Sequence, residues 1–177
     1  MSERKRERPD DYFADWKERE ELAEGMIPLV GKLYRKNNVK TYIYGQNLVN
    51  QSPLEIMQAH RLVRQVEGNE LSEFETFPVI EALARLDLGI AHIDAGRLAL
   101  NYEEQGKTAG ASVDEYVKGQ VADLIGATKE QERHTDVVLY GFGRIGRLMA
   151  RLLIEKAGGG ENLRLKAIVV RDSGAKN

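Results

Sequence analysis

Three glycines in the last quarter of the 177-residue chain have the spacing of a phosphate-binding turn. Gly141, Gly143 and Gly146 fit the pattern Gly-x-Gly-x-x-Gly. In such a turn the first glycine permits a tight change of direction and the second lets the backbone approach a pyrophosphate. The third lets the following helix lie close to the preceding strand. Because the spacing alone is a weak signal, its meaning depends on the elements around it.

The flanking residues predict the strand, helix and strand that this turn needs. Residues 137–140 form an apolar run suited to a buried parallel strand, and residues 145–156 predict a helix. Three glycines at 158–160 end this helix, and residues 165–170 supply a second strand. The helix has apolar side chains available to pack on the sheet. These are Leu148, Leu152 and Ile154.

This order of elements predicts the start of a Rossmann dinucleotide-binding domain. Backbone amides near Arg144 and Ile145 would face the phosphates at the positive end of the helix dipole. Asp172, just past the second strand, could accept hydrogen bonds from the adenosine ribose hydroxyls. The residues expected to bind the cofactor are Gly141, Phe142, Gly143, Arg144, Ile145, Gly146 and Asp172.

Residues 141–148, Gly-Phe-Gly-Arg-Ile-Gly-Arg-Leu, closely resemble the N-terminus of glyceraldehyde-3-phosphate dehydrogenase, as does the later Ala-Ile-Val-Val at 167–170. The long helical region before them suggests the extended bacterial form of that enzyme, in which a helical extension precedes the dehydrogenase body. The resemblance implies NAD or NADP as cofactor, glyceraldehyde 3-phosphate as substrate, and a place in glycolysis or gluconeogenesis. It also implies a homo-oligomer.

Two departures from the family pattern concern the cofactor. Tyr140 stands where the family usually has asparagine, which leaves the local cofactor contacts open. Arg171-Asp172-Ser173 stands where the family often has Asn-Asp-Pro, so a nearby arginine could favour a 2′-phosphate. The choice between NAD and NADP is therefore open.

The chain contains no cysteine, which excludes disulfides, thiolate metal sites and a cysteine nucleophile within it. The resemblance implies thiohemiacetal formation by a cysteine, hydride transfer and phosphorolysis of the thioester, with a histidine as base. We assign no catalytic residue here and interpret the chain as the inactive front part of a longer enzyme. The alternative is a noncatalytic module, in which the helical region mediates oligomerisation or partner binding and the glycine motif is a remnant.

Charge and hydropathy lower the expectation of several other functions. The chain has 26 Lys and Arg against 28 Asp and Glu, and its net charge of -2 gives no attraction to nucleic acid or to an anionic membrane. No run approaches the roughly 20 apolar residues that a membrane-spanning helix needs. Nothing near the N-terminus resembles a signal peptide, so we expect the cytoplasm as compartment.

Residues 12–133 predict a helical domain that follows a charged tail at 1–11 and precedes the truncated β-α-β unit at 134–177. Capping boxes predict three helix starts, because a serine hydroxyl and the glutamate three residues later can satisfy each other's backbone amides. The boxes begin at Ser52, Ser72 and Ser112. The second boundary is open, because the helix could instead begin near Pro78.

Three further segments complete the prediction of four to six helices. Residues 12–34 predict one broken helix or two consecutive helices, interrupted near Gly25 and Pro28. Residues 39–44 are β-branched and aromatic, which predicts a short strand or an extended link. Residues 87–102 have a helical pattern.

Two other groups of residues are weaker candidates for chemistry. His92 and Asp94 could form a metal site or an acid-base pair, but the sequence offers no third partner, so we predict no metal site. Residues 106–108, Gly-Lys-Thr, look like the end of a phosphate loop but lack its first glycine, so a solvated loop is expected.

Overall fold

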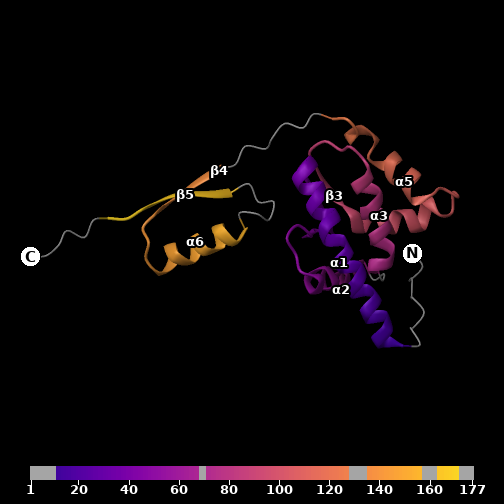
Figure 1. The fold of residues 1–177 in the computed structure, drawn as a ribbon, viewed down its shortest axis with the longest axis horizontal. Helices are drawn as coiled ribbons and strands as arrows, with labels where there is room; N and C mark the ends of the chain where they lie inside the picture. Colours follow the sequence, from indigo (N-terminus) through magenta and orange to yellow (C-terminus); the bar gives the residue numbers. More distant parts are fainter. Residues whose placement is uncertain (1–10, 68–70, 128–134, 157–162, 172–177) are drawn as a thin grey trace, which may run out of the picture. The chain divides into compact units, whose positions relative to one another are not determined.

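The chain divides into two compact units, unit 1 over residues 1–130 and unit 2 over residues 131–177 (Figure 1). In the computed structural model the described residues are mostly helical, as predicted. A three-stranded mixed sheet lies in unit 1 and a two-stranded parallel sheet in unit 2. The structure describes residues 11–67, 71–127, 135–156 and 163–171.

The described part of unit 1 contains five α-helices, which agrees with the predicted number. They are α1 (Tyr12–Asn37), α2 (Pro53–Glu67), α3 (Glu73–Arg85), α4 (Ala95–Asn101) and α5 (Val113–Gln120). Two short turns of other helix types follow α4 and α5. They are the π-helical η1 (Tyr102–Gly106) and the 3-10 helical η2 (Ala122–Leu124).

The predicted capping boxes form and fix the helix starts. The Ser72 amide donates to Glu75 Oε2 at 2.7 Å, and the Glu115 amide donates to Ser112 Oγ at 3.3 Å. The open boundary is thereby settled, since α3 begins directly after Ser72 and carries Pro78 inside it.

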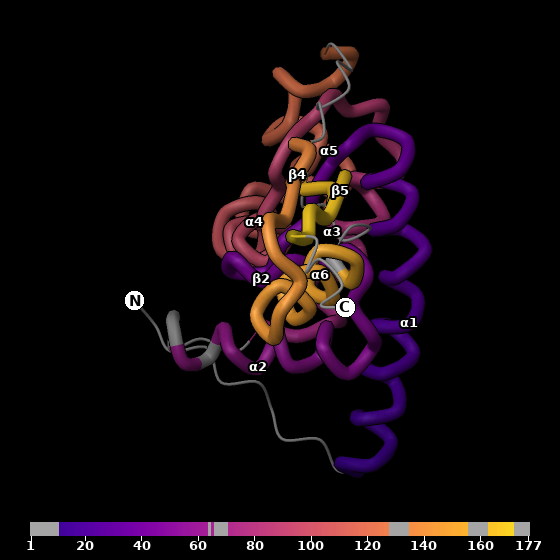
Figure 2. The backbone as a smooth tube through the Cα atoms, turned by 90° about the vertical axis from the view of Figure 1, so that its left-hand side faces the viewer, coloured from indigo at the N-terminus to yellow at the C-terminus, as the bar shows by residue number. Residues whose placement is uncertain are grey.

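The expected interruption of the first helix is wrong, because α1 runs unbroken past Pro28 (Figure 2). Proline lacks the amide that would bond to the Glu24 carbonyl, but both residues are exposed, so water can solvate this carbonyl. Gly25 does not break the helix either. A Cβ atom there would lie 2.8 Å from the Phe77 ring of α3, so this glycine permits close packing. The helix is held by its buried side chains, among them Ala23, Met26, Val30 and Leu33.

A parallel strand pair organises the sheet of unit 1. Strand β1 (Val39–Ile43) confirms the predicted strand and pairs antiparallel with the short β2 (Gln46–Asn47). On its other side β1 pairs parallel with β3 (Ala91–Asp94), from Val39 opposite Ala91 to Tyr42 opposite Asp94.

Strand β3 corrects the helix expected over residues 87–102. Only its second half is α-helical, because α4 begins at Ala95. Gly89 and Gly96 weaken a helix here, and hydrogen bonding to β1 gives the first half a better alternative. A Cβ on Gly96 would lie 3.1 Å from Ile43 Cγ2, so this glycine lets α4 lie close to β1.

The described part of unit 2 contains β4 (Thr135–Tyr140), α6 (Arg144–Lys156) and β5 (Leu163–Val169), with the two strands parallel. The buried strand expected at 137–140 is wrong in part, since Val138 is 56% and Tyr140 72% exposed. The helix covers only one face of the sheet, so alternate residues of β4 stay open.

The prediction of which side chains pack α6 on the sheet is also wrong. Leu148, Leu152 and Ile154 are 57%, 41% and 66% exposed, whereas Ala150 and Leu153 are buried. These two lie four and seven positions after Gly146, so they share its face of the helix, and the contact at this glycine sets which face meets the sheet.

A buried polar cluster lies within the core of unit 1. His60 is 2% exposed, with Nδ1 2.8 Å from the Ile56 carbonyl and Nε2 2.7 Å from Thr76 Oγ1. Because a carbonyl can only accept, Nδ1 carries the hydrogen and Nε2 accepts from the threonine hydroxyl. Glu73 Oε1 lies 3.5 Å from Nδ1, and Arg19 lies 3.6 Å from the same carboxylate.

These surroundings favour the neutral imidazole. Burial is the largest effect and lowers the pKa of His60 from 6.5 to about 4. The hydrogen bond to the Ile56 carbonyl acts in the opposite direction and raises the pKa. The nearby Arg19 charge also lowers the pKa, and the Glu75 charge raises it.

We therefore expect unit 1 to lose stability as the pH falls from 7 to 4. The folded-state pKa of His60 lies below the unfolded value. The contribution of the neutral, buried imidazole to the free energy of unfolding is therefore complete above pH 6.5 and declines as the pH falls toward 4. A shift of this size corresponds to about 3 kcal/mol. Urea unfolding of the wild type and of His60→Gln at several pH values measures this contribution, and an equally steep pH dependence in both would contradict it.

Candidate functional site

The turn after β4 depends on glycine at its first position. Gly141 has φ +101°, a backbone conformation that residues other than glycine rarely adopt. Its amide donates to the Val169 carbonyl at 2.7 Å and so extends the hydrogen bonding between β4 and β5 by one residue. This is the tight turn that the sequence predicts for the first glycine.

The third glycine lets α6 approach the same turn. A Cβ atom on Gly146 would collide with the carbonyl oxygen of Gly141 and lie 3.2 Å from its carbonyl carbon. Only a residue without a side chain allows this contact, as the spacing of the motif predicts.

The middle glycine differs because the described residues leave space beside it. A Cβ atom on Gly143 would meet no described atom within 4 Å, so packing within the chain does not require glycine here. Its carbonyl accepts from the Arg147 amide at 3.0 Å, which places it directly before the first turn of α6. The open space lies on the part of the turn where the motif lets a phosphate approach.

The first turn of α6 offers backbone donors next to this space. The amides of Arg144, Ile145 and Gly146 lie too early in the helix to find an intrahelical acceptor. The side chains of Arg144 and Ile145 are exposed, the latter by 78%. The helix dipole adds a partial positive charge, so this end of α6 could bind an anionic group.

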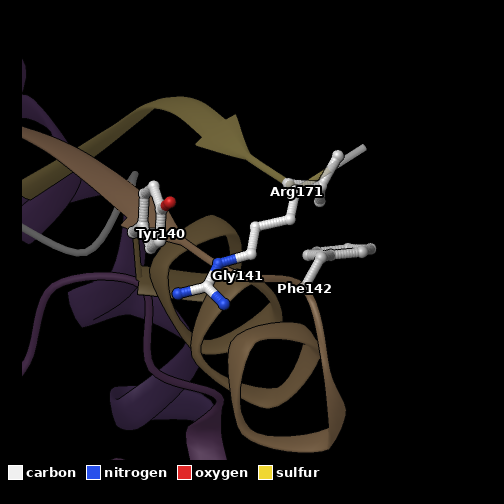
Figure 3. A pocket seen from close by; sticks show the side chains of 5 residues that line it. Tyr140, Gly141, Phe142 and Arg171 are labelled. Atoms are coloured by element: carbon white, nitrogen blue, oxygen red, sulfur yellow. The ribbon is translucent and has the colours of Figure 1, made fainter. Parts of the chain in front are cut away.

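An open cavity of about 470 Å³ lies where the two strands end. Tyr140, Gly141 and Phe142 line it after β4, and Val170 and Arg171 line it after β5. Figure 3 shows the Arg171 side chain extending from the end of β5 over Gly141, between the two aromatic rings. The cavity therefore combines aromatic surface, backbone and one guanidinium.

The structure brings the predicted cofactor-binding residues together, apart from one that it does not describe. Gly141 and Phe142 line the cavity, and the residues 143–146 form the turn and the start of α6. Asp172 lies outside the described residues. The lining role of Tyr140 was not predicted, although its position directly before the first glycine places it at the strand end.

Asp94 is a structural residue and holds a hairpin. Its carboxylate accepts from the Arg97 amide at 3.0 Å as the N-cap of α4, and from the amides of Tyr44 and Gly45 at 3.1 and 3.3 Å. The His92 ring lies 5.7 Å from the Tyr42 ring. Within the described ranges no group of three or more His, Cys, Asp or Glu could hold a metal ion.

The Gly-Lys-Thr segment begins in a π-helical turn, which corrects the expected loop at Gly106. A Cβ atom on Gly106 would collide with the Tyr102 ring, so this glycine permits a packing contact. Lys107 forms an ion pair with Glu103 at 2.6 Å.

Among the helices that the structure describes, none is long and apolar enough to cross a membrane.

Comparison with known proteins supports the dehydrogenase resemblance. No protein-family model matches the chain. The chain is 51% identical over 155 residues to a glyceraldehyde-3-phosphate dehydrogenase-like protein from Pseudomonas aeruginosa strain UCBPP-PA14. The match covers 86% of this chain and 33% of that protein, so the chain spans about a third of the length of the curated relative.

The similarity extends over both units. The match covers 86% of the chain, which is longer than unit 1 and much longer than unit 2, so neither unit alone can contain it. The match therefore takes in most of unit 1 together with part of unit 2. The resemblance read from the glycine turn applies to the helical region as well.

We expect Gly146→Ala to destabilise unit 2, because its methyl group would push α6 away from the Gly141 carbonyl. The cost should be about 1–3 kcal/mol, as for other overpacked contacts. Gly143→Ala is the matched control, since its methyl group meets no described atom. Hydrogen exchange of the β4 and β5 amides in the full chain measures the effect, and equal protection in both variants would refute it.

Proposed function

We propose that this chain is the N-terminal part of an NAD(P)-dependent oxidoreductase resembling glyceraldehyde-3-phosphate dehydrogenase, acting in glycolysis or gluconeogenesis. The observation that carries this proposal is the 51% identity to a dehydrogenase-like protein over 86% of the chain. The glycine turn at 141–146 gives it a physical basis, because its conformation and spacing suit a dinucleotide pyrophosphate.

In this proposal unit 2 is the first β-α-β of a Rossmann domain. Strands β4 and β5 are parallel and joined through α6, and the cavity lies beyond their carboxyl ends. Ligands of open α/β sheets bind at this edge. The remaining boundaries proposed are a tail at 1–11, a helical extension at 12–133 and the dinucleotide-binding part at 134–177, in a cytoplasmic protein.

The described residues fit a dinucleotide. The space beside Gly143 admits a pyrophosphate that a side chain there would obstruct, and the amides of Arg144 and Ile145 can donate to it. The adenosine half would occupy the cavity beside Phe142, with Asp172 as the proposed ribose contact. A bound cofactor would supply the nicotinamide ring as hydride acceptor.

The residues of this chain hold and orient the cofactor, and the covalent chemistry needs groups outside it. The chain has no cysteine to attack an aldehyde. His60 is buried and hydrogen-bonded to Thr76, so it cannot serve as a base toward a substrate. We therefore propose that the 177 residues are inactive alone and that glyceraldehyde 3-phosphate is the substrate of the longer protein.

The chain should therefore bind NAD or NADP without turning over glyceraldehyde 3-phosphate. Gly143→Val should weaken dinucleotide binding at least about tenfold, because its side chain would occupy the pyrophosphate space. Gly119→Val is the control, since Gly119 of α5 also has no described atom within 4 Å of a Cβ. Titration calorimetry measures binding, and reduced nicotinamide absorbance measures turnover. Equal affinity in both variants would count against the assigned site, and steady turnover by the chain would refute its inactivity.

A second candidate function, homo-oligomerisation through the helical region, is favoured by aromatic side chains at the start of α1. Tyr12 and Phe13 are 63% and 64% exposed, and the partly exposed Trp16 lines a cavity with Tyr12 and Met57. Exposed aromatic groups of this kind are typical of protein interfaces.

If this surface joins copies of the chain, the double variant Tyr12→Ser, Phe13→Ser should shift the chain from dimer to monomer in sedimentation equilibrium. Both side chains are mainly exposed, so the fold of unit 1 should persist. Ile125→Ser is the control, because Ile125 is a partly exposed apolar residue that follows η2, far along the chain from α1. A wild type that is monomeric at all concentrations, or a double variant with unchanged mass, would exclude this surface as the interface.

A further inference from the structure

Among the described residues, one cation lines the cavity at the strand ends of unit 2. Arg171 lies two residues after the end of β5, is exposed, and lines the cavity together with Tyr140 and Phe142 (Figure 3). No carboxylate among the described residues forms an ion pair with it. Its guanidinium is therefore available to a ligand beside Gly141.

The two cations of β5 itself, Arg164 and Lys166, are both paired with the same carboxylate. Arg164 and Lys166 lie 2.9 and 3.2 Å from the Asp136 carboxylate, and their hydrogen bonds lower the pKa of that carboxyl. Both lie before the end of the strand, whereas Arg171 follows it. Of the residues that line the cavity in the described part of the chain, Arg171 is the one that carries a positive charge.

The position of this arginine bears on the ribose of a dinucleotide. In folds of this class a residue shortly after the second strand contacts the 2′ position of the adenosine ribose, and in this chain Arg171 and Asp172 both follow that strand. A carboxylate there accepts from a free 2′-hydroxyl, whereas an arginine provides a fork of donors that matches a phosphate.

We propose that the site prefers a dinucleotide with a 2′-phosphate, and that Arg171 is the residue that selects it. This inference rests on the proposed function and adds the cofactor class and its specificity residue. The 2′-phosphate would meet the guanidinium in the cavity, while the pyrophosphate would occupy the space beside Gly143.

The test measures dissociation constants of NADP+ and NAD+ for the full 177-residue chain by titration calorimetry. We expect NADP+ to bind roughly 10- to 100-fold more tightly, as one charged, bidentate contact provides. Arg171→Gln should remove this preference and leave NAD+ affinity unchanged. Arg171→Lys should keep part of it, because the charge stays and the fork is lost.

Arg151→Gln is the matched control for loss of one positive charge. Arg151 is exposed on α6, and seven residues of helix place it about 10 Å along the axis from Arg144. The preference for NADP+ should survive this change. Circular dichroism of each variant verifies that the fold is kept.

Three results would overturn the inference. Equal or tighter binding of NAD+ by the wild type would refute the 2′-phosphate preference and leave the proposed function standing. Equal weakening of both dinucleotides by Arg171→Gln would show that this residue attracts phosphate without selecting the cofactor. A folded chain that binds neither dinucleotide would refute the inference together with the proposed dinucleotide site.

Discussion

The close approach of α6 to the turn after β4 is the contact on which the candidate site depends. Gly141 turns the chain at a positive φ, and Gly146 leaves room for the Gly141 carbonyl against the first turn of the helix. This contact aims the first amides of α6 at the edge where the strands end. Arg171 follows β5 at the same edge and lines the cavity there together with Gly141.

Unit 1 is organised around the parallel strand pair β1 and β3. Strand β1 lies between β2 and β3, and α1 packs against α2, α3 and β1. The carboxylate of Asp94 links the end of β3 to the hairpin after β1 and to the start of α4. The buried His60 ring has a hydrogen-bonding partner at each of its two nitrogens, as burial of a polar side chain requires.

Features set by local chemistry could be predicted from the sequence, and features set by distant contacts could not. The capping box at Ser72 depends on a residue three positions away, and the conformation of Gly141 depends on its own turn. The strand at 91–94 depends on pairing with residues about fifty positions earlier. The continuity of α1 through Pro28 likewise depends on packing across the core, which outweighs one missing hydrogen bond. The position of Arg171 at the cavity could not be predicted either, because it depends on how the ends of both strands lie.

The architecture of unit 2 couples its stability to whatever occupies its strand ends. Ala150 and Leu153 are the buried apolar side chains among its described residues, and Val138 and Tyr140 leave one sheet face open. A two-stranded sheet with so small a core is only marginally stable by itself. A ligand that binds only the folded form adds stability in proportion to the logarithm of its concentration above the dissociation constant. In a unit with so few buried side chains, phosphate contacts at the turn and at Arg171 would thus contribute to holding the strands and helix together as well as to recognition.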